Sequence, residues 1–406
     1  MNRRDFIHTS TGLAAIALMP EVLAAAPRSA DPIGVAVIGA GRQGRAIMGE
    51  LQKLTAAKVL VLCDNDAGRL RSGLGRAAGA EGVDDYRTAL ERRDVQAVVI
   101  ATPTHEHRAI AVDAMAAGKH VYCEAPLAHT IDDTRAIAAA AAGSSSLFAA
   151  GFEGRSNPVY RLARTFYRSD SVRTLIAVRS QHVQKTSWRF PTSDAARERA
   201  VNWRLDPEVS IGLAGELAAH QIDVIRWYTS LDPTSIHGFG SVRLWEDGRT
   251  IADTVQLVIG LGKAVQMQWL GSLATSFESR NEILHGENAT VKLAWSHGWM
   301  FKEADAPTQG WEVYANKQQF HSDEGITLIA DATKLASQGK LKDGVGLPNP
   351  SLYYALEDFI RAIVEKKPVG CDAVEGAKST IAGILANQSV VRGEAVTIDA
   401  ATLGVA

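Results

Sequence analysis

Two patterns of apolar residues divide the chain. Up to about residue 170, short continuous apolar runs alternate with stretches in which apolar residues recur every three or four positions. Continuous runs are typical of buried parallel strands, and the spaced stretches are typical of amphipathic helices. Farther along, apolar and polar residues alternate, as in strands with one exposed face. The chain is therefore predicted to be an α/β protein, in which a doubly wound parallel sheet precedes an α/β domain with an open, mostly antiparallel sheet.

These patterns give an explicit map of elements. Parallel strands are predicted at 33–38, 58–64, 96–102, 120–124 and 147–152, and alternating strands at 172–183, 236–244, 254–261, 264–270 and 290–294. Helices are predicted at 131–142, 213–228, 352–364 and 374–391, and the polar stretch 298–347 is interpreted as loop and short elements. We expect a leader and linker at 1–30, a first domain at 31–155 and a second at 156–406, whose last helices pack back on the first.

A glycine-rich turn follows the first predicted strand. The sequence GAGRQG places glycines in the G-x-G-x-x-G pattern between a strand and a helix. The first glycine allows the tight turn, the second lets the backbone approach a pyrophosphate, and the third lets the helix pack closely on the strand. The free amides at the start of the helix then hold the phosphates. We predict a Rossmann domain that binds a dinucleotide through Gly39, Ala40, Gly41, Arg42, Gln43 and Gly44.

The end of the second predicted strand indicates which dinucleotide binds. Asp64 lies twenty residues beyond Gly44, where a carboxylate can bond both hydroxyls of the adenosine ribose. The same negative charge would repel a 2′-phosphate, so NAD is expected rather than NADP. The segments 102–107 and 124–126 follow two further strands and should meet Asp64 in one crevice, because ligands of such sheets bind outside the carboxyl ends of the strands.

Composition restricts the class of protein. The 406 residues carry a formal net charge of −2, with 46% hydrophobic and 22% charged residues, as in a globular protein of about two domains. Such a balance gives no electrostatic reason to expect nucleic acid or an anionic membrane surface. Three isolated cysteines favour buried thiols over disulfides. His105 and His107 lack further ligands at suitable spacing, so no metal site is predicted.

The first thirty residues are similar to a twin-arginine export signal. Arg3 and Arg4 precede an aromatic and an aliphatic residue, a modest apolar segment follows at 12–18, and small residues at 24–26 suit cleavage. This pattern predicts a periplasmic or otherwise exported protein, the twin-arginine export machinery as a partner, and no membrane span in the mature form. Because a periplasm offers no nicotinamide pool, we expect NAD to be tightly held and recycled.

The motifs together resemble the glucose–fructose oxidoreductase, inositol dehydrogenase and MocA family. They are GAGRQG, the acid Asp64, TPTHEH at 102–107, EAP at 124–126 and an E-x-x-x-H-x-x-D pattern at 216–223. The resemblance implies an N-terminal Rossmann domain, a second domain whose sheet often mediates homo-oligomerisation, and an active site between them. It adds further candidates to the cofactor site, namely Thr102, Pro103, Thr104, His107, Glu124 and Ala125.

The candidate catalytic residues are expected on the helix at 213–228. Glu216, His220 and Asp223 are spaced i, i+4 and i+7, so the three side chains share one face of an α-helix. Flanking carboxylates fix the tautomer of a histidine and make it more basic, as needed to take a proton from an alcohol. The resemblance makes His220 the acid/base. The alternative is a core histidine with a satisfied partner.

Ala125 departs from the family pattern. The family usually has a lysine here, beside the nicotinamide and the substrate hydroxyl, where it assists proton transfer. An alanine neither donates nor accepts a proton. Either His220 acts alone, another residue such as Lys185 enters, hydride transfer is one part of a longer reaction, or the protein is non-catalytic.

Aromatic and basic residues suggest the substrate. The candidates for substrate binding are Arg155, at the expected domain junction, and Lys185, Trp188, Trp203 and Arg204. Tryptophan faces and arginine forks suit the ring and hydroxyls of a sugar, although a loop anchored by tryptophan would look the same. The sequence therefore predicts an NAD-dependent oxidoreductase acting on a sugar or polyol. Two alternatives stay open: a redox-neutral NAD-dependent glycoside hydrolase or lyase that works by oxidation and elimination, and a non-catalytic binding protein.

Overall fold

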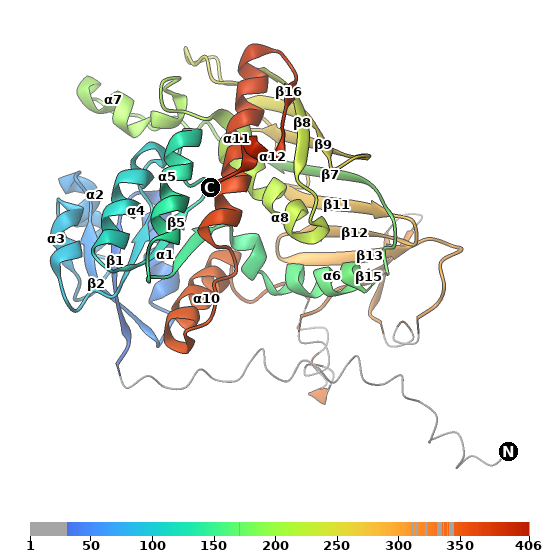
Figure 1. Ribbon diagram of the computed structural model, residues 1–406, viewed down its shortest axis with the longest axis horizontal. Helices are drawn as coiled ribbons and strands as arrows, with labels where there is room; N and C mark the ends of the chain where they lie inside the picture. Colours follow the sequence, from blue (N-terminus) through green and yellow to red (C-terminus); the bar gives the residue numbers. More distant parts are fainter. Residues whose placement is uncertain are drawn as a thin grey trace.

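The computed structural model describes residues 31–169, 171–309, 312, 315–320, 323–330, 335, 337–338, 340 and 345–405. The predicted export signal at 1–30 lies outside the described residues. Two sheets lie side by side, and helices cover the first sheet (Figure 1). The long helix α11 (Ala373–Arg392) runs between the two halves and contacts elements of both.

The first sheet is parallel and, among the described residues, six-stranded. In spatial order its strands are β3 (Glu81–Val83), β2 (Ala57–Cys63), β1 (Ile33–Ile38), β4 (Ala97–Ile100), β5 (His120–Glu124) and β6 (Phe148–Gly151). Every residue of β1 is buried, as its continuous apolar run predicts for a strand covered on both faces. Only the short edge strand β3 was not predicted.

Helices connect these strands in the doubly wound manner. They are α1 (Arg42–Leu51), α2 (Ala67–Leu74), α3 (Tyr86–Glu91), η1 (Thr104–Glu106) with α4 (His107–Ala116), and α5 (Ile131–Ala142). The Thr130 side chain caps α5 by accepting from the Asp133 amide, and Gly143 ends the helix. The predicted bounds of this helix are therefore confirmed, since both end signals are local.

The second sheet begins after η2 (Glu153–Ser156) and α6 (Pro158–Arg168). Its described part has ten strands, which pair antiparallel except for β7 with β10. In spatial order they are β14 (Lys317–Phe320), β15 (Asp323–Thr327), β13 (His297–Lys302), β12 (Ala289–Ala294), β11 (Arg280–Gly286), β7 (Leu175–Val183), β10 (Val265–Ser272), β9 (Thr254–Leu261), β8 (Pro233–Ser241) and β16 (Val396–Thr397).

The stretch left as loop and short elements extends this sheet. β13, β14 and β15 lie within it and pair antiparallel, next to β12. The sequence did not reveal them because their residues are few and mostly polar; every residue of β14 is exposed or half-buried. The strand β11 was also missed, although it supplies one wall of the site described below.

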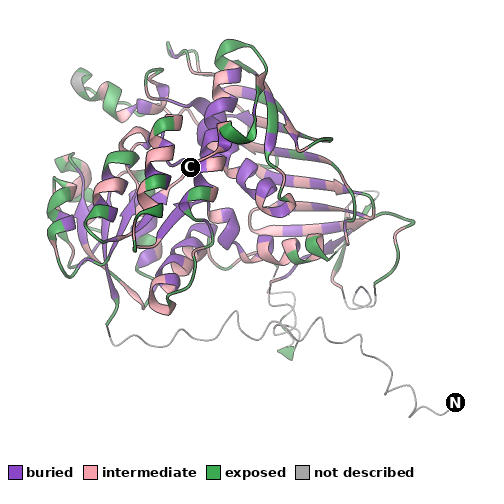
Figure 2. Ribbon diagram, viewed as in Figure 1, coloured by how far each residue is buried: buried purple, intermediate pink, exposed green. Residues whose placement is uncertain are grey.

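Helices of the second half pack on both sheets. They are α7 (Ala195–Val201), η3 (Trp203–Leu205), η4 (Ala214–Ala218), α8 (Ala219–Thr229), α10 (Ser351–Glu365), α11 and α12 (Ala400–Leu403). α8 is buried on nearly all sides between the second sheet and α11 (Figure 2). Leu352, Leu356 and Phe359 of α10 share a core with β1 and α1 of the first sheet. In the described part of the chain, no helix is both long enough and apolar enough to cross a membrane.

Candidate active site

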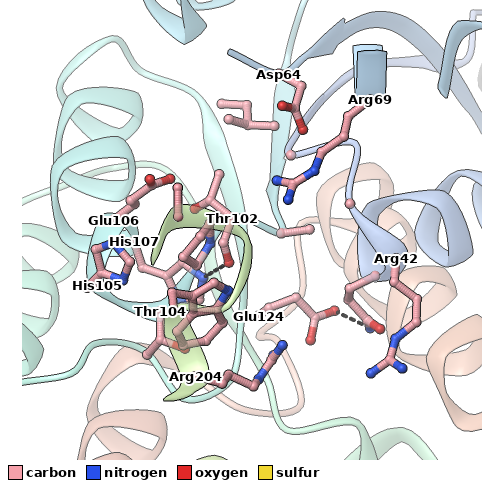
Figure 3. Close-up of a pocket in the computed structure, with 18 of the residues that line it drawn as sticks. Arg42, Asp64, Arg69, Thr102, Thr104, His105, Glu106, His107, Glu124 and Arg204 are labelled. Atoms are coloured by element: carbon pink, nitrogen blue, oxygen red, sulfur yellow. Dashed lines mark hydrogen bonds between the residues drawn. The ribbon is translucent and has the colours of Figure 1, made fainter. Parts of the chain in front are cut away.

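A cavity of about 1060 Å³ lies where the two halves meet. The carboxyl ends of β1, β2, β4 and β5 line one side of it, and β7, β11, η4, α8 and the segment around α7 line the other. Most of the predicted residues line this cavity: Gly39, Gly41, Arg42, Gln43, Asp64, Thr102, Pro103, Thr104, His107, Glu124, Ala125, Trp188, Trp203, Arg204, Glu216 and His220. Figure 3 labels several of them, among which Arg42, Asp64, Thr102, Thr104, His107 and Glu124 come from the first half.

The three glycines of the turn differ in their surroundings. Gly39 has φ +101°, and a Cβ there would lie 2.6 Å from the Ala101 carbonyl oxygen. A Cβ on Gly44 would collide with the Gly39 carbonyl oxygen, so this glycine lets α1 pack on the turn. A Cβ on Gly41 would meet nothing within 4 Å. The backbone at Gly41, which caps the N-terminus of α1, is therefore open to a ligand.

Asp64 is held at the edge of the cavity by backbone amides. One carboxylate oxygen accepts from the Ala40 N–H at 2.8 Å, and the other accepts from the Asp66 N–H at 2.8 Å. Each oxygen keeps a second lone pair for a ribose hydroxyl. Arg69 lies beside it (Figure 3). Ala40 and Gly44 do not line the cavity, and Ala40 acts through this amide.

The next two strand ends are fixed to each other. The ring nitrogens of His107 lie 3.0 Å from the carbonyl oxygens of Pro126 and Thr102, so this side chain ties the loop after β4 to the loop after β5. Burial lowers the pKa of His107 to about 4, and the ring is neutral at physiological pH. Burial, and then the charge of Glu153, raise the pKa of Glu124 to about 8; this carboxyl accepts from the Gln43 side chain at 3.2 Å.

Glu216 joins the two halves at the cavity wall. One oxygen accepts from the Thr104 hydroxyl at 2.9 Å, and the other accepts from Arg204 Nε at 3.1 Å. The Arg204 guanidinium carbon lies 4.3 Å from the Trp203 ring centroid and 5.6 Å from that of Trp188. The predicted aromatic and basic cluster thus lies in the cavity, and Glu216 orients its arginine rather than contacting His220.

His220 lies on the same wall, at the start of α8. Burial, and then the charge of Arg280, lower the pKa of His220 well below its usual value, so the ring is neutral. The Ala125 backbone opposes this shift. Nδ1 is buried and has no partner, whereas Nε2 is not buried and makes no hydrogen bond within the described residues, so Nε2 is the nitrogen that reaches the cavity. A neutral imidazole with such an open nitrogen is able to accept a proton.

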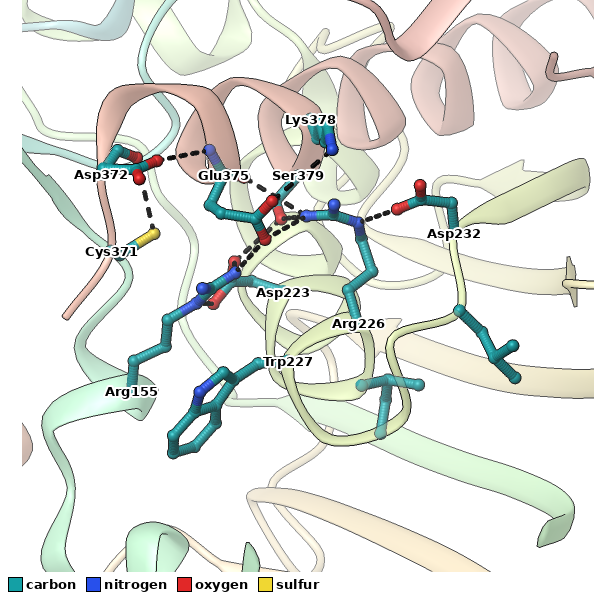
Figure 4. Close-up of polar contacts among 12 residues, drawn as sticks. Arg155, Asp223, Arg226, Trp227, Asp232, Cys371, Asp372, Glu375, Lys378 and Ser379 are labelled. Atoms are coloured by element: carbon teal, nitrogen blue, oxygen red, sulfur yellow. Dashed lines mark hydrogen bonds and ion pairs between the residues drawn. The ribbon is translucent and has the colours of Figure 1, made fainter. Parts of the chain in front are cut away.

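Asp223 lies elsewhere, and the prediction that it shares a face with Glu216 and His220 is wrong. It is fully buried and accepts from Arg155 Nε at 2.9 Å, Arg155 Nη2 at 2.8 Å and the Ser379 hydroxyl at 2.9 Å (Figure 4). The π-helical turn η4 lies between Glu216 and α8, and its i→i+5 bonds place more residues in each turn, which changes the rotation of Asp223 relative to Glu216. His220 and Asp223 lie in the same α-helix, and Asp223 is directed to its buried partners on η2 and α11.

Two predicted substrate-binding residues also lie outside the cavity. Arg155 is buried, and its guanidinium donates hydrogen bonds to Asp223 and to Glu375, with Nη2 at 3.0 Å from Glu375 Oε2. Lys185 is exposed, and its backbone amide bonds the Ser276 hydroxyl. Neither side chain lines the cavity.

The polar residues of the cavity wall that the sequence interpretation missed include Glu153, His182 and Arg280. Glu153 follows β6 directly, so its place at the end of a parallel strand could have been noticed. His182 and Arg280 are direct partners across β7 and β11. No local signal identifies them, because the pairing joins strands about a hundred residues apart.

The cavity fits a dinucleotide. The open backbone at Gly41 and the first amides of α1 suit a pyrophosphate, and the first turn of α1 carries no acidic residue that would repel it. Asp64 suits the adenosine ribose. In the described part of the chain, no group of three histidine, cysteine, aspartate or glutamate side chains is arranged to hold a metal ion.

Comparison with known proteins agrees with this geometry. The model of the oxidoreductase family with an NAD-binding Rossmann fold matches residues 33–152, and that of the GFO/IDH/MocA C-terminal domain matches residues 160–292. Levoglucosan dehydrogenase of Pseudarthrobacter phenanthrenivorans is 30% identical over about a third of either chain. Inositol 2-dehydrogenase 1 of Saccharopolyspora erythraea is 29% identical over 64% of this chain and 74% of its own. A glycosyl hydrolase family 109 protein of a Shewanella strain is 32% identical over 32% of this chain and 35% of its own.

Solved structures share the fold over nearly the whole chain. A levoglucosan dehydrogenase in complex with NADH and levoglucosan superposes with a TM-score of 0.72 at 19% identity, covering 91% of this chain and all of that one. The myo-inositol 2-dehydrogenase of Lactobacillus plantarum gives a TM-score of 0.68 at 18% identity, with the same coverage of both chains. The two family models together span more than half of the chain, which therefore belongs to the GFO/IDH/MocA family of NAD-binding oxidoreductases.

Proposed function

We propose that this protein is an NAD-dependent oxidoreductase that oxidises a hydroxyl of a sugar or polyol. The observation that carries the proposal is His220, whose neutral ring lines the same cavity as the glycine turn and leaves Nε2 open. The relatives named levoglucosan dehydrogenase and inositol 2-dehydrogenase point to the same substrate class.

Each group of residues has a part in this reaction. Bound NAD⁺ supplies the hydride acceptor, and the turn at 39–44 with Asp64 would hold it. His220 takes the proton of the substrate hydroxyl. Arg204, oriented by Glu216, donates to other hydroxyls, while Trp188 and Trp203 offer faces to the sugar ring. Asp223 and Arg155 hold α8 in place from the opposite side.

We also propose that the cofactor is retained between turnovers. The segment 184–204, here called the strap, leaves the second half and lines the cavity with Phe190 and Arg197. The Arg197 guanidinium pairs with Asp66, beside Asp64, and the Arg42 guanidinium carbon lies 6.0 Å from the Phe190 ring centroid. The strap therefore spans from one half to the other over the cofactor end of the cavity.

A nucleotide and substrate screen tests the function. Protein purified from its native compartment and dialysed should still contain NAD(H) by mass spectrometry. Addition of neutral sugars and polyols, with myo-inositol and levoglucosan among them, should produce NADH absorbance at 340 nm on the protein. Dialysed protein that neither contains nor binds NAD, or that binds NAD and reduces it with none of these compounds, would contradict the proposal.

A second candidate function is a redox-neutral glycosidase. The similarity to a glycosyl hydrolase family 109 protein favours it, as does Ala125, which supplies no proton donor beside the cofactor. Oxidation of the sugar would acidify a neighbouring C–H bond, and the glycosidic substituent would leave by elimination. Water would add to the resulting C=C bond, and reduction of the carbonyl would restore NAD⁺. Release of 4-nitrophenol from aryl glycosides without net NADH distinguishes this reaction from the first.

Export and self-association complete the proposal. The paired arginines near the N-terminus support translocation to the periplasm, and a cofactor retained under the strap would suit a compartment without a nicotinamide pool. The exposed side chains of Ile176, Phe239 and Val258 on the second sheet support a homo-oligomer. Fractionation of cells expressing Arg3→Lys/Arg4→Lys protein tests export, and light scattering of the mature protein tests the oligomer.

A further inference from the structure

Arg280 keeps two buried donors without a partner at the cavity wall. Its side chain is 11% exposed, and Nε and Nη2 bond to no atom of the described residues. The guanidinium carbon lies 3.3 Å from the Trp295 ring centroid, and Nη1 lies 3.8 Å from Glu153. The ring fixes the plane of the guanidinium and Glu153 faces its third nitrogen. The parallel Nε–H and Nη2–H pair, the edge that suits an oxygen ligand, is left open.

His220 presents an open acceptor to the same space. Nδ1 is buried and has no partner, whereas Nε2 is not buried and makes no hydrogen bond within the described residues. Nε2 is therefore the nitrogen that a substrate hydroxyl can reach, and it is the base in the tautomer that carries its hydrogen on Nδ1.

The two residues line the same cavity, and the charge of one acts on the other. Among charged groups, Arg280 has the largest effect on the pKa of His220, and His182, the cross-strand partner of Arg280, has the next. Arg280 likewise adds to burial in lowering the pKa of His182 to about 3. Burial raises the pKa of the Glu153 and Glu282 carboxyls, and the charge of Arg280 opposes this rise in both. Glu282 is buried and accepts hydrogen bonds from Tyr160 and Gln221.

We propose that Arg280 is a catalytic residue, which binds the reacting oxygen of the substrate through Nε–H and Nη2–H while His220 Nε2 accepts the hydroxyl proton. This rests on the function proposed above. Of simple polar groups, an alcohol fits these atoms, because its oxygen accepts from the arginine and its O–H donates to the imidazole. A carbonyl has no proton for Nε2, and an ammonium group has no lone pair for Arg280.

The chemistry balances on these two residues. The hydroxyl proton passes to Nε2 of His220, and the electron pair of the O–H bond becomes the second bond of the carbonyl. Bound NAD⁺ would supply the acceptor for the C–H pair, as hydride. Negative charge that develops on the oxygen is stabilised by the two guanidinium donors, which still bond the product carbonyl. Arg280 thus supplies, from β11 of the second half, a cationic donor that Ala125, directly after β5, does not supply.

Two substitutions with a matched control test this role. In NAD-loaded protein mixed with the best substrate of the screen, Arg280→Gln should lower the rate of hydride transfer about 10²- to 10³-fold. Arg280→Lys keeps the positive charge but lacks the paired guanidinium donors, so its rate should lie between those of the wild type and Arg280→Gln. Arg179→Gln, on the exposed face of β7, should leave the rate unchanged. All four proteins should bind NAD equally.

The pH profile separates this role from a structural one. Removing the positive charge should raise the pKa of His220 towards its ordinary value, so the acid limb of the rate profile should shift to higher pH in Arg280→Gln. A rate within threefold of the wild type, or an unshifted limb in a folded, NAD-loaded variant, would overturn the proposal.

Calorimetry keeps the test independent of turnover. Binding of myo-inositol and levoglucosan to NADH-loaded protein should weaken at least about tenfold in Arg280→Gln, and equal binding would overturn the role of Arg280. A wild-type protein that binds these compounds without oxidising them would refute the proposed function alone.

Discussion

His220 and Asp223 lie three residues apart on α8 and belong to opposite kinds of environment. His220 lines the cavity with Nε2 open and Nδ1 unpartnered, and Arg280 lines the same cavity with two unpartnered donors. Asp223 is fully buried, and its partners are complete: two bonds from Arg155 and one from Ser379. A buried polar group whose bonds are satisfied within the chain holds the structure together. One whose bonds are left open awaits a ligand.

The closed cluster extends beyond this pair. Arg155 also bonds Glu375 of α11, and Arg226 of α8 bonds Ser379 at 2.9 Å and Asp232 at 2.7 Å (Figure 4). These contacts join η2, at the end of the first half, to α8 and α11. A cluster of this kind fixes how α8 presents His220 to the cavity, and its own charges take no part in the chemistry.

The largest expected effect is the loss of turnover when His220, the residue with an open nitrogen, is replaced. His220→Asn keeps a polar side chain but removes a base of suitable pKa, and kcat/KM should fall about 10²- to 10⁴-fold. NAD content and thermal unfolding should stay near the wild type, because the ring makes no strong hydrogen bond that holds the fold. Measured turnover close to the wild type would remove His220 from the mechanism. His220, like Asp223, would then have a structural role only.

The next largest effect is a loss of stability when Asp223, the residue whose hydrogen bonds are satisfied within the chain, is replaced. Asp223→Asn leaves the Arg155 charge without its main partner, and the free energy of unfolding should fall by about 3–5 kcal/mol, as read from urea denaturation. The protein that remains folded should turn over at nearly the wild-type rate. The double variant Arg155→Met/Asp223→Leu should recover much of the stability. If Asp223→Asn instead abolished turnover in fully folded protein, the contrast between the two residues would fail.

This contrast also marks the limit of what the sequence predicts. The strands of the first sheet and the helix α5 follow from continuous apolar runs and local end signals, and they were predicted. The pairing of Trp188, Trp203 and Arg204 at the cavity could also be inferred from their residue types. Such features depend on neighbours in the sequence.

The features that the sequence did not predict depend on distant contacts. The π-turn at 214–218 has no composition that distinguishes it from an α-helix, yet it moves Asp223 off the face of Glu216. Arg155 and Asp223 are 68 residues apart, and which arginine pairs with which carboxylate is decided by packing. Arg280 reaches the cavity because β11 pairs with β7, and no single segment contains that information.

The smallest expected effect concerns an intermediate case, the ion pair between Arg197 of the strap and Asp66. The two side chains are bonded to each other but remain in contact with solvent, since Arg197 is 50% exposed and Asp66 is 17% exposed. The pair is therefore neither a buried cluster nor an unoccupied ligand site. Exposed pairs contribute about 0–1 kcal/mol, so Arg197→Gln should speed NAD release no more than about fivefold, in stopped-flow exchange against a fluorescent analogue. Added salt should speed release from the wild type and leave the variant unchanged, because the pair is the screened element. Glu198→Gln, one residue along the strap, should change neither rate. Release accelerated far beyond fivefold by Arg197→Gln would mean that this pair behaves like the Arg155–Asp223 contact, and that exposure does not separate structural from marginal ion pairs in this molecule.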